Sequence, residues 1–437
     1  MTFLLNGLYL VLLTFVSPWL ILRRLRYGRY RRGWSDRFFG QTKMAPESSS
    51  VVWLHAVSVG EVQVLRTLVE GLASQRPDLS LAISVSTDSG MELAEKLFSK
   101  HRVFFTPLDF SWSMRRTLLA LRPKLIVLAE LELWPNWLTI AEQLGCPVAV
   151  INGRLSERSF TGYSRFQPMV GRFLRKIDFV GAQSVSYASR FEKLGLPRER
   201  LVVTGNVKFD NAAGNRDAEQ VLMRKQMLQL TGLHRILLAG STQSPEEKIV
   251  LDMFAELSKR WPDIKLILVP RHAERFAEVA KQIAAIGLPW AQRSQCPVTV
   301  SDPNWRIFLG DSVGELRWWW GLAEIGFVGG SFGDRGGQNM IEPCAYGVAT
   351  CFGPNTRNFS DIVKLLQEHN ACAQLQSPEE LGPWIESMLE DPARRNEMAQ
   401  RARSVCQTHR GATQRTWEHL QKMLPRPTTH PAATQSL

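Results

Sequence analysis

Short apolar runs alternate with helix-length amphipathic stretches along most of this chain, and this alternation constrains the fold more strongly than any other feature. The runs include VVWLH at 51, KLIVLAE at 124, RILLAGS at 235 and AEIGFVGG at 323. Strands of a parallel sheet are apolar on both faces and need a helical connection from one strand to the next. The alternation therefore predicts βαβ units and an α/β fold built on parallel sheets.

The alternation pauses over a polar stretch at 211–232 and then resumes. Because 437 residues exceed the length over which one hydrophobic core keeps growing, we expect two domains. The predicted division is an N-terminal segment at 1–40, a Rossmann-like domain at 41–210, a linker at 211–232, a second such domain with C-terminal helices at 233–423, and a disordered tail at 424–437. Two doubly wound domains facing each other would gather their strand ends around one interdomain cleft, where ligands bind in such folds.

The N-terminal segment combines an apolar run with a cluster of arginines. Residues 3–22 carry no charged side chain, and about 20 residues of helix approximate the thickness of a bilayer core. Seven arginines follow between 23 and 37, whereas a secretory signal would carry its positive charges before the apolar run. The pattern predicts a membrane anchor helix, with the arginines and everything after them on the cytoplasmic side. Asn6 and Pro18 leave open a helix that lies in the membrane interface.

The charge balance and the cysteines narrow the class of protein further. A formal net charge of +12 implies an anionic partner, such as nucleic acid, a membrane surface or a phosphorylated substrate. The densest arginine cluster lies beside the apolar run, which disfavours nucleic acid. The six cysteines form no C-x-x-C pair and accompany no histidine cluster at metal-ligand spacing, so we expect a reduced compartment and no structural zinc.

A glycine-rich stretch at 323–342, AEIGFVGGSFGDRGGQNMIE, joins an apolar strand to the start of a helix. Backbone N–H groups freed by the glycines, together with the partial positive charge of a helix N-terminus, can hold a phosphate. Glu342, one turn into the helix, can accept ribose hydroxyls. The alternative is a glycine-rich turn in which Glu342 only complements the helix dipole.

Two acidic motifs end strands in the first half, S-V-G-E at 58–61 and E-L-E-L-W-P at 130–135. Carboxylates at the ends of two strands of one sheet converge on one edge. Beside another carboxylate and an apolar side chain, such a group can have its pKa raised towards the range of a general base. Spacing alone favours instead a capping box, in which Ser58 and Glu61 only satisfy the first N–H groups of a helix. For Glu130 the alternative is a solvated acid at a helix start.

Three strand ends in the second half also suit a phosphate. Arg271 ends the strand KLILV and can donate two hydrogen bonds to a phosphate or carboxylate, although an exposed arginine at a strand end is the commoner situation. The segments 311–315 and 240–242 close two further strands. With the glycine loop, four strand ends of one predicted sheet carry phosphate-compatible chemistry, which favours a binding edge.

These residues resemble the 3-deoxy-D-manno-octulosonic acid (Kdo) transferases of lipopolysaccharide synthesis, inverting glycosyltransferases that move Kdo from CMP-Kdo to a lipid A precursor. The resemblance covers nearly the whole chain. Its motifs occur in the same order: WLHAVSVGEV at 53, ELELWPN at 130, INGRLSERS at 151, TGNVKFD at 204, VPRH at 269, DSVGEL at 311 and GGQNMIEP at 336.

The resemblance implies a GT-B architecture with a C-terminal helix that crosses back to the first domain. It implies that Glu61 is the general base and that Glu130 and Lys208 are the other catalytic positions. Gln338 and Gly153 depart from the family, which usually has His and Ala at these positions. The CMP contacts implied by the resemblance are Pro270, Arg271, Val313, Gly314, Glu315, Asn339, Met340, Ile341 and Glu342.

In the implied mechanism, Glu61 accepts the proton of a glucosamine primary hydroxyl as that oxygen attacks the anomeric carbon of Kdo and CMP leaves from the opposite face. The implied partners are CMP-Kdo, the lipid A precursor and the inner membrane at its cytoplasmic face, with no nucleic acid. We expect no metal ion and no cofactor, since no D-x-D-like motif is present. The alternatives are another GT-B enzyme acting on a UDP-sugar, whether a transferase or an epimerase, and a non-catalytic membrane nucleotide sensor.

Overall fold

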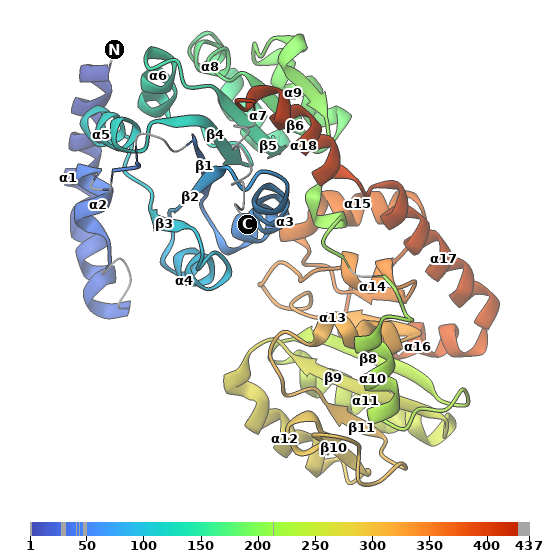
Figure 1. The fold of residues 1–437 in the computed structure, drawn as a ribbon. Coiled ribbons are helices and arrows are strands. Elements are labelled where there is room, and N and C mark those ends of the chain that lie inside the picture. The colour runs from blue at the N-terminus through green and yellow to red at the C-terminus, as the bar shows by residue number, and fades with distance from the viewer. Residues whose placement is uncertain are drawn as a thin grey trace, which may run out of the picture. The chain divides into compact units, whose positions relative to one another are not determined.

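The structure is a computed structural model that describes residues 2–27, 32–40, 42, 44–46, 50–212 and 214–426. The chain divides into two compact units, one formed by Met1–Val207 with Gly411–Leu437 and the other by Lys208–Arg410. Each unit is a parallel sheet with helices packed around it (Figure 1). The predicted α/β fold with two parallel sheets is therefore confirmed.

The sheet of the first unit has seven strands in the order β3-β2-β1-β4-β5-β6-β7. All its neighbouring strands pair in parallel, and the order reverses where β1 lies beside β4. The strands are β1 (Ser50–Ala56), β2 (Leu79–Val85), β3 (Arg102–Phe105), β4 (Pro123–Ala129), β5 (Val148–Gly153), β6 (Phe179–Ala182) and β7 (Leu201–Val203).

Helices cover both faces of this sheet because successive strand residues point to opposite sides. In β1, Trp53 belongs to one buried cluster, in which its ring lies 4.4 Å from that of Trp137, and Leu54 belongs to the cluster on the other face. The helices of this unit are α1 (Thr2–Tyr27), α2 (Trp34–Phe39), α3 (Val59–Gln75), α4 (Asp88–Leu97), α5 (Ser111–Leu121), α6 (Pro135–Gln143), α7 (Glu157–Ser164), α8 (Gln167–Leu174), α9 (Val185–Lys193) and α18 (Ala412–Met423).

Helix α1, which contains the apolar run, lies alongside α5 (Figure 1). Asn6 is buried, and its side chain exchanges hydrogen bonds with Ser111, donating to the hydroxyl at 2.7 Å and accepting from the backbone N–H at 3.0 Å. The Tyr9 hydroxyl donates to Asp109 at 3.0 Å. These polar contacts fix one face of α1 against the unit. Within the part of the chain that the structure describes, no helix combines the length and the apolar character needed to cross a membrane.

The sheet of the second unit also has seven strands, in the order β10-β11-β9-β8-β12-β13-β14. The strands are β8 (Arg235–Thr242), β9 (Ile264–Pro270), β10 (Trp290–Gln292), β11 (Ile307–Leu309), β12 (Ile325–Val328), β13 (Ala349–Phe352) and β14 (Ala373–Gln374). The helices are α10 (Glu219–Met227), α11 (Glu246–Arg260), α12 (Phe276–Ala285), α13 (Leu316–Trp319), α14 (Ile341–Ala345), α15 (Ser360–Glu368), α16 (Leu381–Glu390) and α17 (Pro392–Thr408). Here the strand order reverses where β8 lies beside β12.

Two boundaries differ from the predicted ones. The predicted linker at 211–232 contains α10 and belongs to the second unit, because Val221, Met227 and Leu228 are buried in that unit's core. The second unit ends at Arg410 rather than at 423, and α18 belongs to the first unit. Trp417 is buried there and donates to the Gln75 side chain at 2.6 Å. A few apolar residues on one face of a largely polar helix are enough to bury it, and such residues give a weak signal in the sequence.

Candidate active site

The two predicted acidic residues of the first unit follow neighbouring strands. Glu61 lies in the first turn of α3, just after β1, and Glu130 follows β4 directly. β1 and β4 pair in parallel at the point where the strand order reverses. Ligands bind beyond the carboxyl ends of the strands at such a point. The fold thus brings these two residues to the usual ligand position of a doubly wound sheet.

Two hydrogen-bond donors that lie close to it in the sequence hold the Glu61 carboxylate. Oε2 accepts the N–H of Val57 at 2.7 Å, and Oε1 accepts the hydroxyl of Ser58 at 3.0 Å. This arrangement differs from the predicted capping box. Ser58 is the N-cap residue of α3, but its hydroxyl donates to Glu61 and accepts no backbone N–H of the helix in the described structure. The reason is that Glu61 reaches back past Ser58 to the preceding N–H. Its carboxylate is oriented by these contacts while keeping lone pairs that the two donors do not use.

Burial raises the pKa of Glu61 to about 7, against the lowering effect of the Val57 N–H. Glu130 and Glu132 raise that pKa further by charge repulsion, and the Ser58 hydroxyl lowers it. Burial, followed by repulsion from Glu130, also raises the pKa of Glu132 to about 7. Like charges repel, so a negative charge on either neighbour makes ionisation of Glu61 less favourable. A base with a pKa near neutrality is well suited to accept a proton from a substrate hydroxyl.

The backbone at these strand ends is unusual. Glu130 has φ 57° and Asn152, in the adjacent strand β5, has φ 53°, both in the left-handed region that non-glycine residues seldom adopt. Two hydrogen bonds support these conformations: the Glu130 N–H donates to the Ile151 carbonyl at 2.9 Å, and Asn152 Oδ1 accepts from Val207 N–H at 3.1 Å. Such conformations cost on the order of 1–3 kcal/mol each and concentrate at functional sites.

Lys208, the third predicted catalytic residue, lies in the second unit. It belongs to a short 3-10 helix, Val207–Phe209, and its ammonium group lies 5.3 Å from the centroid of the Phe359 ring. This contact is a cation–π interaction, which orients the lysine side chain.

The glycine loop of the second unit is organised by a residue that the sequence analysis missed. Glu246, at the start of α11, accepts four backbone N–H groups. Oε2 accepts from Gln243 at 3.0 Å and Gly330 at 2.6 Å, while Oε1 accepts from Ser331 at 2.9 Å and Phe332 at 3.0 Å. An internal carboxylate therefore occupies the N–H groups of Gly330 and the two residues after it. The predicted phosphate site of the glycine-rich stretch has to use the N–H groups that Glu246 does not engage.

The later part of the loop brings several predicted residues together. Asn339 Nδ2 donates to Glu342 Oε1 at 3.1 Å, and Asn339 Oδ1 accepts the N–H of Ile341 at 3.1 Å. Burial raises the pKa of Glu342, against the lowering effects of Asn339, Arg317 and Arg271. The two guanidinium groups thus lie close enough to act on this carboxylate. Arg271 itself is exposed and can contact a ligand phosphate.

Arg271 is also tied into the sheet edge. It follows the buried Pro270 at the end of β9, and its N–H donates to the Thr242 carbonyl at the end of β8 at 2.9 Å. Met340 and Ile341, at the start of α14, are fully buried, so they contribute packing and backbone groups rather than exposed side chains. The predicted residues of this unit therefore converge on one edge of its sheet from β9 and from the glycine loop.

At the third predicted strand end, residues 311–315, the acidic residue Glu315 has a structural role. Val313 is 81% exposed, and Gly314 has φ 86°, a conformation that suits glycine. The Glu315 carboxylate pairs with Arg293 at 3.0 Å and Arg224 at 3.1 Å. Although burial raises its pKa, hydrogen bonds from Arg293 and Ser312 and the charge of Arg224 bring it below the ordinary value. The side chain of Glu315 is thus engaged within the protein, which leaves the exposed backbone at 313–314 for a ligand.

The structure also shows the surroundings of Gln338 and Gly153, the two residues that depart from the family. The Gln338 side chain packs against Gly330, where an added Cβ would lie 3.1 Å from its Cγ and Nε2 atoms. An added Cβ on Gly153 would meet Val180 Cγ1 at 3.2 Å and the carbonyl oxygen of Gly181 at 3.3 Å. An alanine at 153 therefore requires its neighbours to move by a few tenths of an ångström. For metals, no group of three or more His, Cys, Asp or Glu residues in the described ranges is arranged to hold an ion.

Comparisons with known proteins connect this geometry with a family. Residues 32–211 match the family described as 3-deoxy-D-manno-octulosonic-acid transferase. A protein of that name from Haemophilus influenzae is 32% identical over 91% of this chain and 93% of its own length. The chain belongs to the Kdo transferase family. Another Kdo transferase, from Bordetella pertussis, is 31% identical over 96% of this chain and 99% of its own length.

The fold of this Kdo transferase family member also has solved counterparts. A structure of MnaA from S. aureus with UDP covers 85% of this chain and 96% of its own, with a TM-score of 0.54 and 14% identity. At that identity the likeness establishes the fold alone. The chain has a GT-B-like α/β fold, as the resemblance predicts.

Proposed function

We propose that this protein is an inverting glycosyltransferase that moves Kdo from CMP-Kdo to a lipid A precursor, lipid IVA, and releases CMP. The proposal rests on membership of the Kdo transferase family and above all on one observation. Glu61 stands at the ligand-binding end of the first sheet with a pKa raised to about 7. That is the property required of a base that activates a sugar hydroxyl near neutral pH.

In the proposed reaction, a glucosamine hydroxyl oxygen attacks the anomeric carbon of Kdo and transfers its proton to Glu61. The bond from that carbon to the CMP phosphate breaks, and the electron pair leaves with the phosphate on the opposite face of the sugar. One displacement inverts the configuration. The base contributes on the order of 10²- to 10⁴-fold, and positioning and electrostatic stabilisation supply the rest. Glu130 and Lys208 are proposed to act in that stabilisation.

The second unit is proposed to bind CMP-Kdo at the edge formed by β8, β9 and the glycine loop. Arg271 and Arg317 offer positive charge beside Glu342. The phosphate is matched to the guanidinium groups, and Glu342 is matched to ribose hydroxyls. The proposed contacts at this edge are Pro270, Arg271, Val313, Gly314, Glu315, Asn339, Met340, Ile341 and Glu342.

We further propose that α1 attaches the enzyme to the inner membrane with its catalytic units on the cytoplasmic side. Large apolar side chains of α1 are exposed, among them Phe3 at 87%, Leu4 at 81% and Phe15 at 79%. The polar contacts of Asn6 and Tyr9 hold the helix along the first unit. A helix that is held to its own protein by polar contacts and exposes large apolar side chains supports attachment in the membrane interface, reinforced by the neighbouring arginines.

Mass spectrometry of a tetraacyl lipid A precursor tests the activity. The purified protein is incubated with that precursor, CTP, Kdo and a CMP-Kdo synthetase, with Glu61→Gln as the matched variant. Added Kdo masses that disappear in the variant, while CMP affinity is unchanged, would support the proposal. A folded protein that binds CMP and adds no mass would contradict it and favour a nucleotide sensor. Protection by UDP in place of CMP would favour a UDP-sugar enzyme.

A further inference from the structure

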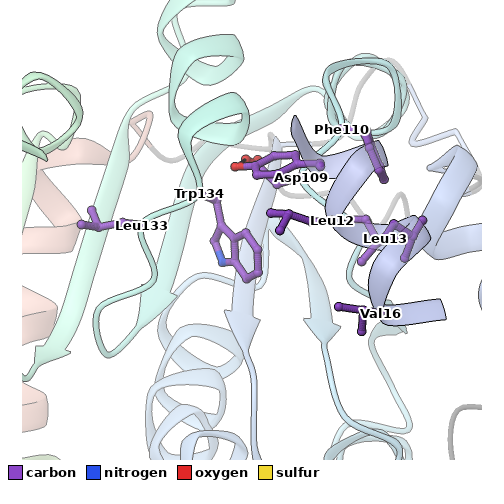
Figure 2. Close-up of a pocket in the computed structure, with 9 residues that line it drawn as sticks. Leu12, Leu13, Val16, Asp109, Phe110, Leu133 and Trp134 are labelled. Atoms are coloured by element: carbon purple, nitrogen blue, oxygen red, sulfur yellow. Dashed lines mark hydrogen bonds between the residues drawn. The ribbon is translucent and has the colours of Figure 1, made fainter. Parts of the chain in front are cut away.

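We propose that an apolar groove between α1 and the loop after β4 binds a fatty acyl chain of the lipid acceptor. The groove has a volume of about 340 Å³, which lies in the range of small-ligand sites. Leu12 and Val16 of α1 lie across the groove from Trp134 (Figure 2), and Leu133 and Phe110 also contribute to its lining. The inference rests on the proposed function and names the part of the acceptor that this unit recognises.

The groove is a consequence of how α1 is attached. Its polar contacts come from Asn6 and Tyr9, in the first half of the helix, and both connect to the segment 109–111. Beyond them, Leu12 is 50% exposed and Val16 is 42% exposed, although both face the unit's surface. Helix α1 is thus held at one end by hydrogen bonds and stands away from the protein further along. The space between is lined by apolar side chains.

The charged side chain in the lining of the groove is already paired within the protein, while the indole N–H of Trp134 is buried without a hydrogen-bond partner among the described residues. Asp109 lies in its lining, but its carboxylate accepts the N–H groups of Asn136 and Trp137 at the start of α6 and the hydroxyl of Tyr9. It therefore acts as a helix cap and as the attachment point of α1. A ligand in the groove meets hydrocarbon, which suits an alkyl chain and gives a charged or sugar group little to bind.

A single loop connects the groove with the candidate active site. Leu133 and Trp134 follow Glu132 directly in the chain, and Glu130 and Glu132 lie near enough to Glu61 to raise its pKa by charge repulsion. One loop therefore carries the acidic groups at one end and a wall of the groove at the other. A glycolipid whose sugar reaches Glu61 can place an acyl chain along Trp134.

Charge complementarity supports a lipid with an anionic head group as the occupant. Arg115 and Arg116 are exposed on α5, the helix against which α1 packs. Trp112 of the same helix is partly exposed and stacks on Phe110, whose ring lines the groove, with centroids 4.5 Å apart. An aromatic pair at an apolar groove, with basic groups exposed on the same helix, matches a phosphorylated lipid at a membrane interface.

Filling the groove tests the inference. In Val16→Trp and Leu12→Trp the larger side chain occupies the groove, whereas Leu10→Trp adds the same volume at an exposed position of the same helix that does not line it. Initial rates are measured in detergent with a tetraacylated acceptor and with the same sugar after complete deacylation. We expect the KM for the acylated acceptor to rise at least 10-fold in the two groove variants, with the rate on the deacylated sugar and all rates of Leu10→Trp unchanged.

Three results would overturn the inference: equal effects on both acceptors, no effect on either, or the same effect from Leu10→Trp. A fluorescent fatty acid gives a reading that does not depend on turnover, because the groove variants should lose its binding and Leu10→Trp should keep it. If the unmodified protein transfers no Kdo to either acceptor, the proposed function fails. Fatty-acid binding would still report separately on the groove.

Discussion

Glu61 and Glu246 occupy the same kind of position in the two units, yet their surroundings differ sharply. Each lies at the start of a helix that follows a parallel strand, at the point where the strand order of its sheet reverses. Glu246 is 1% exposed and accepts four backbone N–H groups. Glu61 accepts one backbone N–H and one hydroxyl, and two further carboxylates lie near it.

The difference separates a structural carboxylate from a reactive one. Burial raises the pKa of Glu246 as well, but four backbone N–H donors act against that rise and fix the glycine loop around the carboxylate. Glu61 has two donors instead of four, and its acidic neighbours add to the cost that burial places on the charged form. Both residues look alike in a sequence as a glutamate near a helix start. The number of donors therefore separates a carboxylate committed to internal hydrogen bonds from one that keeps lone pairs for a substrate proton.

The largest expected effect comes from Glu246→Gln. A glutamine offers one acceptor oxygen in place of two, and its NH₂ group would face two N–H donors, leaving buried donors without partners. We expect the free energy of unfolding to fall by about 3 kcal/mol, since each unsatisfied buried donor costs on the order of 1–3 kcal/mol. Urea denaturation measures the change, and the KM for CMP-Kdo should rise as the loop loosens.

Glu256→Gln is the matched control for that variant, because Glu256 lies on the same helix and its side chain is 75% exposed. Its stability should stay within about 0.5 kcal/mol of the unmodified protein, as is usual for surface substitutions. An equally stable Glu246→Gln would show that the four N–H bonds do not distinguish the two glutamates.

Glu61→Gln should change stability in the opposite direction. The pKa of Glu61 is raised from 4.5 to about 7 on folding. A raised carboxyl pKa favours folding fully below the unfolded value, and this contribution is lost as the pH rises through the folded value. Above pH 8 the variant should therefore be more stable, by about 2 kcal/mol after allowance for solvent screening. The difference should vanish near pH 4, and a variant that is less stable at pH 8 would contradict the shift.

The sequence predicts the strands that position the two glutamates better than it predicts the hydrogen-bond donors around them. The apolar runs at 51, 124, 235 and 323 became β1, β4, β8 and β12, because buried parallel strands are apolar on both faces. The position of Glu61 and Glu130 at one sheet edge followed from the same pattern. Strands recognised in the sequence do not show which loop faces which helix start, since that depends on the order in the sheet of strands that are distant in sequence.

Glu246 illustrates that limit, because its partners Gly330, Ser331 and Phe332 lie 84 to 86 positions away in the chain. The sequence suggested that the N–H groups of the glycine-rich loop could bind a phosphate, because nothing near the loop in the sequence indicated that Glu246 accepts three of them. The groove beside α1 was missed for a related reason: an apolar run suggests a membrane segment, whereas Asn6 and Tyr9, two polar residues within it, dock the helix on its own protein.

The pH dependence of catalysis provides the next test of the comparison. If Glu61 accepts the proton, it must be ionised, so kcat/KM should fall tenfold per pH unit below about 7 and level off above it. Ser58→Ala removes a donor that lowers this pKa, so the acid limb should move to higher pH with the plateau rate nearly unchanged. Ser184→Ala, which removes the cap of α9 in the same unit, is the control, and its profile should keep the unmodified midpoint.

Glu132→Gln should produce the smallest shift, and in the opposite direction. Repulsion from Glu132 is the last of the influences that raise or lower the pKa of Glu61, after burial, the Val57 N–H, Glu130 and Ser58. Removing that charge should lower the pKa of Glu61, so the acid limb of kcat/KM moves to lower pH by less than Ser58→Ala moves it upward. The double variant then shows a net upward shift if the two influences are independent. A Glu132→Gln profile that moves upward would mean that this side chain assists ionisation of Glu61 instead of opposing it, and the acidic cluster would have to act through a shared proton.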